Sequence, residues 1–322
     1  MTTELLMALG EETGLRQLDL QRIMVSAPHR YKVYSIPKRS GGSRQIAQPA
    51  REVKAVQRAL MRVLLEELPV HAAATAYRKG ISIRDNARPH AASGPILKLD
   101  LKNFFPSIRV ADWVSYCGES GCLTERTDVA LTAQLLFFKP KGTRSLSLAI
   151  GAPSSPILSN ILMYKFDESL SEELSKDKVI YTRYADDMTF SAPRTGYLTG
   201  VMSTVARRLR RLQFPKLSIN GEKTTYVTMK YHRAVTGLTL ANDGRVTIGR
   251  NQKRTISASV HHAVMGTLDA EDKQMLSGML AFINAVEPAF IGVLRRKYGN
   301  AIIADIQMTT VPRRPRELYS AR

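Results

Sequence analysis

Two short β-like runs flank a pair of adjacent aspartates, Asp186 and Asp187, within the segment YTRYADDMTFS at residues 181–191. The runs at 179–183 and 188–191 predict a β-hairpin whose tip concentrates two negative charges. Like charges held side by side repel each other unless a cation lies on them. The hairpin therefore predicts a metal site, although a simple polar turn is the common alternative for an isolated Asp-Asp pair.

A third carboxylate, Asp100, lies near the end of the apolar run 96–101, which predicts a short buried strand. If this strand lies beside the hairpin, three carboxylates converge at one end of a sheet. Magnesium binds few protein ligands and shares the phosphate oxygens of a substrate. Two such ions activate an attacking hydroxyl and stabilise a leaving pyrophosphate. The spacing therefore predicts a site for two Mg²⁺ ions.

Strands and helices are mixed irregularly along the chain, which predicts an α+β fold rather than a doubly wound sheet. The patterns predict helices over about 1–30, 52–68, 199–212 and 255–310, and another that begins with Ser155 as N-cap and Pro156 at its first position. Strands are expected at 31–36, 45–48, 96–101, 179–183, 188–191, 235–240 and 245–248, and a short segment at 216–220.

The charge balance favours a polyanionic partner, because 47 Lys and Arg against 28 Asp and Glu give a formal net charge of +19. The basic residues run along the whole chain, so the folded body itself is expected to bind nucleic acid, with an anionic membrane as the competing partner. No apolar run is long enough to span a membrane, and the N-terminus has no signal-like start. Cys117 and Cys122 lack partners at zinc-finger spacing, which favours a reducing, cytoplasmic location without zinc.

Four motifs resemble those of reverse transcriptases. Tyr184-Ala185-Asp186-Asp187 resembles the catalytic motif of that family, and Leu97-Lys98-Leu99-Asp100 its preceding aspartate motif. Asn86-Ala87-Arg88-Pro89-His90 and Val235-Thr236-Gly237 are similar to the Asn-Ala-x-x-His and Val-Thr-Gly elements of bacterial retron reverse transcriptases. The resemblance extends from about Tyr31 to Tyr298 with the motifs in order.

This resemblance assigns roles to the acidic residues. Asp100 and Asp186 are expected to bridge both magnesium ions, with Asp187 as a more peripheral third carboxylate. The backbone carbonyl of Leu101 is expected to complete the coordination. Lys223 occupies a position where the family often carries a lysine near the leaving pyrophosphate; a surface lysine is an equal alternative.

The incoming nucleotide is expected to contact two further segments. Phe105 is placed where a bulky side chain excludes a ribose 2′-OH, whereas Phe104 is expected in the core. Gly151 and Ala152 belong to a small-residue loop that shapes the pocket through its backbone. Ile150 replaces the usual glutamine of this loop, so no side-chain hydrogen bond to the nucleotide is expected there.

A basic turn around Gly41-Gly42 resembles the fingers hairpin that binds the triphosphate. Arg44 is the expected nucleotide contact and Lys38 a second one, although Lys32 or Arg39 are alternatives to Lys38. A solvated basic loop is the alternative for the whole turn.

Nucleic acid is expected to contact two groups of residues. His232, Arg233 and the Val235, Thr236 and Gly237 element are expected to bind the primer strand. Asn86 and His90 are candidates for RNA contact, with a buried structural histidine as an equal alternative.

The resemblance also implies a right-hand polymerase with an antiparallel palm sheet and a helical thumb. Residues 1–95 form the fingers with an N-terminal helical region, 96–235 the palm together with part of the fingers at about 117–145, and 236–322 the thumb.

The implied reaction copies part of a cognate structured noncoding RNA into single-stranded DNA from dNTPs. Synthesis starts from a guanosine 2′-OH in that RNA and leaves branched RNA-linked DNA, and the family implies antiphage defence with a separate effector protein. One alternative is a binding scaffold that mainly restrains a toxic effector, which the intact carboxylates disfavour. The other is a group II intron-like reverse transcriptase, which the retron-type elements and the lack of maturase and endonuclease extensions disfavour.

Overall fold

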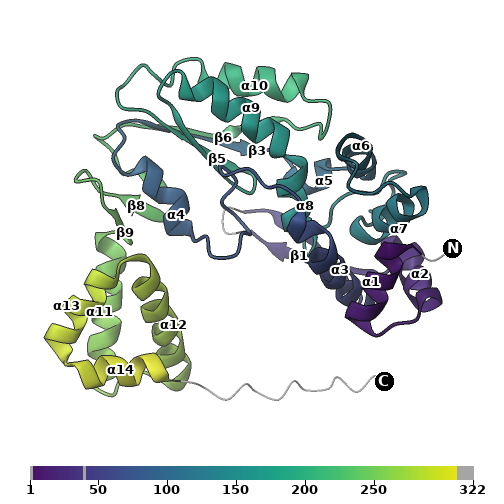
Figure 1. Ribbon diagram of the computed structural model, residues 1–322. Helices are drawn as coiled ribbons and strands as arrows, with labels where there is room; N and C mark the ends of the chain where they lie inside the picture. The colour runs from purple at the N-terminus through teal and green to yellow at the C-terminus, as the bar shows by residue number, and fades with distance from the viewer. Residues whose placement is uncertain (1–2, 39–40, 310–322) are drawn as a thin grey trace. The chain divides into compact units, whose positions relative to one another are not determined.

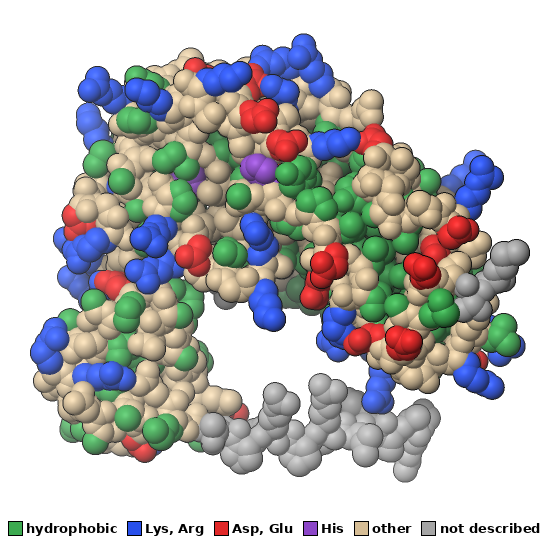
Figure 2. Space-filling model, in the orientation of Figure 1, with side chains coloured by type: hydrophobic (Ala, Val, Ile, Leu, Met, Phe, Trp, Pro, Cys, Tyr) green, Lys and Arg blue, Asp and Glu red, His purple; other side chains and the backbone are tan. Residues whose placement is uncertain are grey.

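The computed structural model describes residues 3–38 and 41–309, and these divide into two compact units (Figure 1). The first unit is Met1–Tyr231 and the second is His232–Arg322. Within the described ranges, no helix is both long and apolar enough to cross a membrane. Lysine and arginine side chains are spread over the visible face of both units rather than gathered in one segment (Figure 2).

A four-stranded antiparallel sheet forms the centre of the first unit, in the order β4-β5-β3-β6. Its strands are β3 (Ile96–Leu101), β4 (Ile180–Tyr184), β5 (Asp187–Ser191) and β6 (Ile219–Val227). The inner strand β3 is buried at every position except the half-buried Lys98, as expected for a strand paired on both sides. The predicted α+β fold, with an antiparallel sheet that contains the aspartate hairpin, is confirmed.

Three helices lie along the sheet: α8 (Ser155–Leu162), α9 (Tyr164–Ser175) and α10 (Val201–Arg211). Figure 1 shows α9 and α10 over one face. Phe166 of α9 and Val205 of α10 are fully buried in the core cluster that also holds the sheet. The predicted start of α8 is off by one residue, because Ser154 rather than Ser155 is its N-cap, and Ser154 makes no side-chain capping bond.

The rest of the first unit is one β-hairpin and a group of helices. Its strands are β1 (Tyr31–Pro37) and β2 (Ser43–Pro49), close to the prediction. The long predicted helix at 52–68 ends earlier, because the backbone leaves the helical region at Leu64 (φ −139°). The helices are α1 (Glu4–Thr13), α2 (Gln17–Ser26), α3 (Arg51–Val63), α4 (Ile83–Ala87), α5 (Phe104–Ser107), α6 (Val110–Ser120), α7 (Arg126–Leu136) and the 3₁₀ helices η1 (Ala27–His29), η2 (Leu65–Glu67) and η3 (Arg88–His90).

The second unit combines a small three-stranded sheet with helices. Its elements are β7 (Ala234–Val235), β8 (Leu238–Leu240), β9 (Val246–Thr247), α11 (Arg250–Val264), α12 (Ala270–Val286), α13 (Pro288–Tyr298) and α14 (Asn300–Met308). The prediction of one strand over 235–240 is wrong. Thr236 and Gly237 both have positive φ, 46° and 81°, and form a two-residue hairpin loop between β7 and β8.

Candidate active site

The three aspartates lie at one end of the central sheet. Asp100 of β3 is paired directly with Asp187 at the start of β5. The hairpin turns through Ala185, which takes a left-handed conformation (φ 58°), and the next residue, Asp186, accepts a hydrogen bond on its backbone oxygen from Leu101 N at 3.0 Å. The fold thus brings together the carboxylates that the sequence places about 85 residues apart.

The site is electrostatically strained. Burial, together with the neighbouring carboxylates of Asp186 and Asp100, raises the pKa of Asp187 to about 6. Burial is also the main reason that the pKa of Asp186 is raised, with Asp100 adding to it. A divalent cation would relieve this repulsion and lower the pKa of both carboxylates.

The donor set suits magnesium, because it consists of carboxylate oxygens and a backbone carbonyl. As the side chains stand, the described residues contain no group of three acidic, histidine or cysteine side chains arranged around one metal position. Both oxygens of Asp100 are engaged: Asn220 Nδ2 donates to Oδ1 at 3.0 Å, and Lys223 Nζ donates to Oδ2 at 2.8 Å. A cation bound to Asp100 would compete with the Lys223 ammonium for this carboxylate.

Lys223 reaches Asp100 because β6 is irregular at this point. Lys98 pairs with Thr225, but Asp100 pairs with Asn220, so residues 221–224 form a bulge opposite β3. The hydrogen bond to Asp100 is the main reason that the pKa of Lys223 is raised. The structure thus places this lysine against the aspartates, where it is able to hold a proton.

A fully buried ion pair supports the hairpin tip from inside. Arg183 donates through Nε to Asp167 Oδ1 at 2.9 Å and through Nη2 to Asp167 Oδ2 at 2.5 Å. Its Nη1 donates to Asn160 Oδ1 and to the Ala185 backbone oxygen, both at 3.1 Å. Tyr181 adds a hydrogen bond from its hydroxyl to Asp167 Oδ1 at 2.8 Å. The left-handed turn before Asp186 is therefore anchored to α8 and α9.

Sequence inspection did not single out Arg183, Asp167 or Asn160. The one local signal in the sequence is a charged residue in a hairpin arm that is otherwise uncharged. The structure buries this residue, Arg183, completely. Its partners lie 16 and 23 residues away on other elements, so only the fold reveals them.

The predicted nucleotide-side residues take different positions. Phe104 is buried in the core, and Phe105 is half-buried with its ring 5.3 Å from that of Phe104. Gly151 packs against β2: its φ is 121°, and an added Cβ would lie 2.9 Å from the Ala47 backbone oxygen. Ala152 is buried beside it. The 151–152 loop thus needs small residues, as the sequence predicts.

The basic turn joins β1 and β2. Lys38 and Arg44 are both exposed, and Gly41 and Gly42 have positive φ of 87° and 76°. The alternative residue Arg39 lies outside the described residues. The two cations therefore stand on a narrow hairpin where solvent or a phosphate is able to reach them.

Asn86 and His90 are buried. The Thr75 hydroxyl donates to Asn86 Oδ1 at 2.8 Å. The two ring nitrogens of His90 lie 2.7 Å from Ser191 Oγ and 2.8 Å from Thr182 Oγ1, and burial lowers the pKa of His90 to about 4. The structure favours the structural alternative for this element, since neither side chain faces a surface that RNA is able to reach.

The predicted primer-binding residues are brought together in the second unit. His232 is exposed, with Nε2 3.0 Å from Thr239 Oγ1, whereas Arg233 and Val235 are 2% and 1% exposed. Within the Val235-Thr236-Gly237 element, Thr236 is half-buried and Gly237 is exposed. The element is thus a turn whose tip, rather than its buried side chains, is accessible to a nucleic-acid strand.

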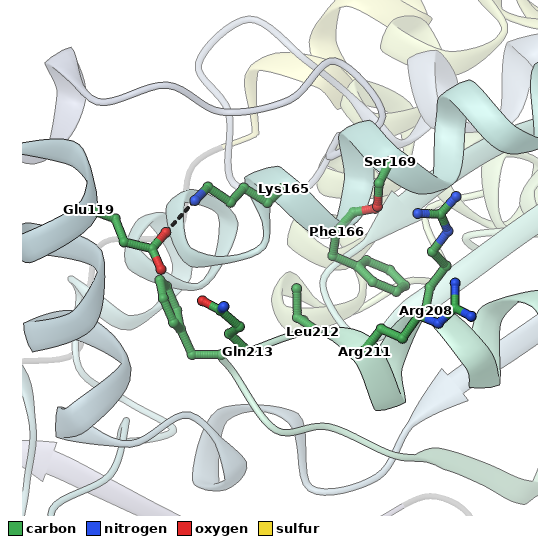
Figure 3. Close-up of a pocket in the computed structure, with 9 residues that line it drawn as sticks. Glu119, Lys165, Phe166, Ser169, Arg208, Arg211, Leu212 and Gln213 are labelled. Atoms are coloured by element: carbon green, nitrogen blue, oxygen red, sulfur yellow. Dashed lines mark hydrogen bonds and ion pairs between the residues drawn. The ribbon is translucent and has the colours of Figure 1, made fainter.

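A cavity of about 310 Å³ lies apart from these residues (Figure 3). It is lined by Glu119, Lys165, Phe166, Ser169, Arg208, Arg211, Leu212, Gln213 and Phe214. Two of its three cations are already neutralised: Lys165 pairs with Glu119, and Arg208 with Glu173. We assign no chemistry to it.

Comparisons with known proteins agree with the geometry of the aspartates. A family model described as reverse transcriptase (RNA-dependent DNA polymerase) matches residues 36–257. The retron Ec83 reverse transcriptase of Escherichia coli is 38% identical over 306 residues, which cover 94% of this chain and 98% of that protein. The retron Ec73 reverse transcriptase of Escherichia coli is 32% identical over 291 residues, covering 87% and 90%. Among solved structures, telomerase from Candida albicans aligns with 88% of this chain and 62% of that chain at 13% identity and a TM-score of 0.49, a likeness too slight to add to these findings.

The matched fold and the converging aspartates define the class: the chain belongs to the reverse transcriptase family and is an RNA-directed DNA polymerase. The extent of the match to the two Escherichia coli proteins narrows the class from reverse transcriptases in general to those of retrons. The chain is a bacterial retron reverse transcriptase, as its Asn-Ala-x-x-His and Val-Thr-Gly elements predict.

Proposed function

We propose that this enzyme copies part of its own structured noncoding RNA into single-stranded DNA, starting from the 2′-OH of a guanosine in that RNA. The observation that carries the catalytic part is the convergence of Asp100, Asp186 and Asp187 at one end of the β4-β5-β3 sheet. The 2′-OH priming and the branched product rest on the resemblance to the retron family.

In this proposal, Asp100, Asp186 and Asp187, with the Leu101 carbonyl, hold two Mg²⁺ ions. When bound, the ions polarise the attacking hydroxyl and the leaving pyrophosphate. Lys223, which donates to Asp100, would give a proton to the leaving group, and its hydrogen bond at the aspartates supports this role. The Lys223 side chain is 60% exposed while the Asp100 side chain is 7% exposed, so the lysine is free to leave the aspartate and meet a phosphate.

The nucleotide is proposed to lie between the basic hairpin and Phe105. Arg44 and Lys38 would bind its triphosphate, the Gly151-Ala152 backbone would border its base, and Phe105 would exclude a ribose 2′-OH. Replacement of Phe105 by Ala tests the last role: ribonucleotide incorporation should rise relative to deoxynucleotide incorporation. Unchanged discrimination would remove Phe105 from this role.

The proposed arrangement assigns residues 1–95 to the fingers, 96–235 to the palm with part of the fingers at about 117–145, and 236–322 to the thumb. The compact second unit begins at His232, which supports a boundary near the end of the palm. The Thr236-Gly237 tip and the exposed His232 would contact the primer strand. Protection of His232 from chemical modification when an RNA–DNA hybrid is bound would support the assignment, and equal modification of His232 with and without the hybrid would contradict it.

The decisive experiment is to sequence the nucleic acid that copurifies with the protein from its bacterial host. A 2′,5′ linkage between a guanosine of one RNA and the DNA copied from it is the expected product. Linear DNA copied from many unrelated RNAs would overturn the retron-type reaction while leaving reverse transcription itself intact.

We also propose that the enzyme acts in the bacterial cytoplasm, in antiphage defence, with a separate effector protein. The family resemblance supports this, and the intact aspartates favour a role that requires synthesis. Phage challenge of cells that carry the wild-type protein or the Asp186→Asn variant tests it. Protection that persists without synthesis would favour the scaffold alternative, in which the protein body restrains the effector.

A further inference from the structure

Tyr77 is a half-exposed aromatic residue beside the proposed nucleotide site. Its ring centroid lies 6.4 Å from that of Phe105 and 6.3 Å from that of Tyr184. The residue is 49% exposed, so the ring is not part of the closed core. Three aromatic side chains from separate segments thus form one wall next to the aspartate hairpin.

The backbone of Tyr77 is held in an unusual conformation. Its φ is 61°, a value that non-glycine residues adopt only at a cost. Such conformations persist where the surrounding structure enforces them, and they concentrate at functional sites. A half-exposed tyrosine gains little from burial in return, so packing alone does not account for the strained position.

Buried hydrogen bonds tie this segment to the aspartate turn. Asn160 Nδ2 donates to the Ala76 backbone oxygen at 2.8 Å, and its Oδ1 accepts from Arg183 Nη1. The same Nη1 donates to the Ala185 oxygen, next to Asp186. One asparagine therefore links the residue before Tyr77 to the group that anchors the catalytic turn.

The pKa of the Tyr77 hydroxyl responds to the charged groups of the same site. Burial raises the pKa of Tyr77, and the Asp186 carboxylate raises it further, whereas Arg44 lowers it. The ring therefore lies within the field of both the metal-binding turn and the arginine proposed to bind the triphosphate.

We propose that Tyr77 is a specificity-determining residue, and that its ring and Phe105 together form the wall against which the sugar of the incoming nucleotide packs. The inference rests on the proposed function of Phe105 and extends it. A flat apolar surface suits the deoxyribose C2′, whereas a 2′-OH against it would lose its hydrogen bonds to water. Two rings supported from different elements restrict the sugar more than Phe105 alone.

Single-nucleotide extension with dNTP and rNTP on an RNA template tests the wall. We expect Tyr77→Ala to raise KM for dNTP and to reduce the preference for dNTP over rNTP by about tenfold or more, with a smaller change in kcat. Tyr77→Phe, which keeps the ring, should stay within about twofold of the wild type. Tyr197→Ala is the matched control: Tyr197 is 44% exposed and follows the end of β5 that is opposite the aspartates.

The outcomes separate the two proposals. If Phe105→Ala relaxes discrimination but Tyr77→Ala leaves both KM and discrimination within about twofold, the role of Tyr77 is refuted and the proposed gate stands. If neither change affects discrimination, both fail. Thermal unfolding of each variant shows whether it is folded. If Tyr77→Ala does not fold, Tyr77→Leu replaces it in the test with the same expected result, because it keeps apolar bulk without a flat ring.

Discussion

The buried pair of Arg183 and Asp167 should contribute to stability and activity in ways that can be separated. Neither side chain has any exposed surface. Asp167→Asn removes the negative charge and leaves a guanidinium buried without a counter-ion, which costs about 3–5 kcal/mol of the free energy of unfolding. Urea denaturation measures this cost directly. The exposed pair of Lys165 and Glu119 supplies the control, because Glu119→Gln should cost no more than about 1 kcal/mol.

A double variant, Asp167→Leu with Arg183→Met, extends the test. Replacing a buried ion pair by apolar side chains of similar size is often neutral, but three further buried groups lose a hydrogen-bond partner here, so only part of the lost stability should return. Activity should not return, because the Ala185 oxygen loses its donor and the left-handed turn before Asp186 loses its anchor. A displacement of the carboxylates by about 1 Å is enough for a loss of about 100-fold in kcat.

Two results would refute this reasoning. A loss of less than about 1 kcal/mol in Asp167→Asn would mean that the pair is not buried as described. A double variant with wild-type kcat would mean that the hydrogen bond to Ala185 does not position the aspartates.

Two further outcomes follow from buried or crowded positions. The pKa of His90 falls from 6.5 to about 4 on folding, so between these two pH values the unfolded chain binds a proton that the folded chain does not. The free energy of unfolding should therefore decrease by about 3 kcal/mol as pH falls from 7 to 4. Urea titrations of the wild type and His90→Gln at several pH values check this. An equal dependence of the free energy of unfolding on pH in both proteins would contradict it. Gly151→Ala should be destabilised by about 1–3 kcal/mol more than Gly142→Ala. The reason is that a Cβ at Gly151 would lie 2.9 Å from the Ala47 oxygen, whereas a Cβ at Gly142 meets nothing within 4 Å. Calorimetry compares the two variants, and equal unfolding temperatures would argue against close packing of the loop at Gly151.

Local sequence patterns predicted those parts of the fold that have strong periodicity. The buried strand β3 and the hairpin arms around Asp186 agree with the structure to within a residue or two. The prediction misses most of β6 and gives only a short segment at 216–220, because every residue of β6 is exposed or half-buried and the strand has no apolar run. The prediction misses the Thr236-Gly237 loop because the β-branched residues around it form one continuous strand-like pattern. Gly237 tolerates the positive φ that this loop requires.

The site shows the same division. The aspartates and the small residue Gly151 can be predicted from the sequence by residue type and spacing. The supporting residues do not, because Asn160 and Asp167 acquire their roles only when α8 and α9 pack against β4. Tyr77 is hidden for a related reason: its backbone conformation and its aromatic neighbours depend on contacts between distant segments.

The most direct test is RNA-templated incorporation of dNTPs by the purified protein and by its Asp186→Asn, Asp187→Asn double variant. RNA binding and thermal unfolding are measured on the same preparations. Loss of incorporation by about 1,000-fold or more, with RNA affinity and unfolding temperature close to those of the wild type, is expected if these carboxylates hold the catalytic metal ions. Incorporation that persists in the double variant would contradict the assignment of the hairpin tip as the active site.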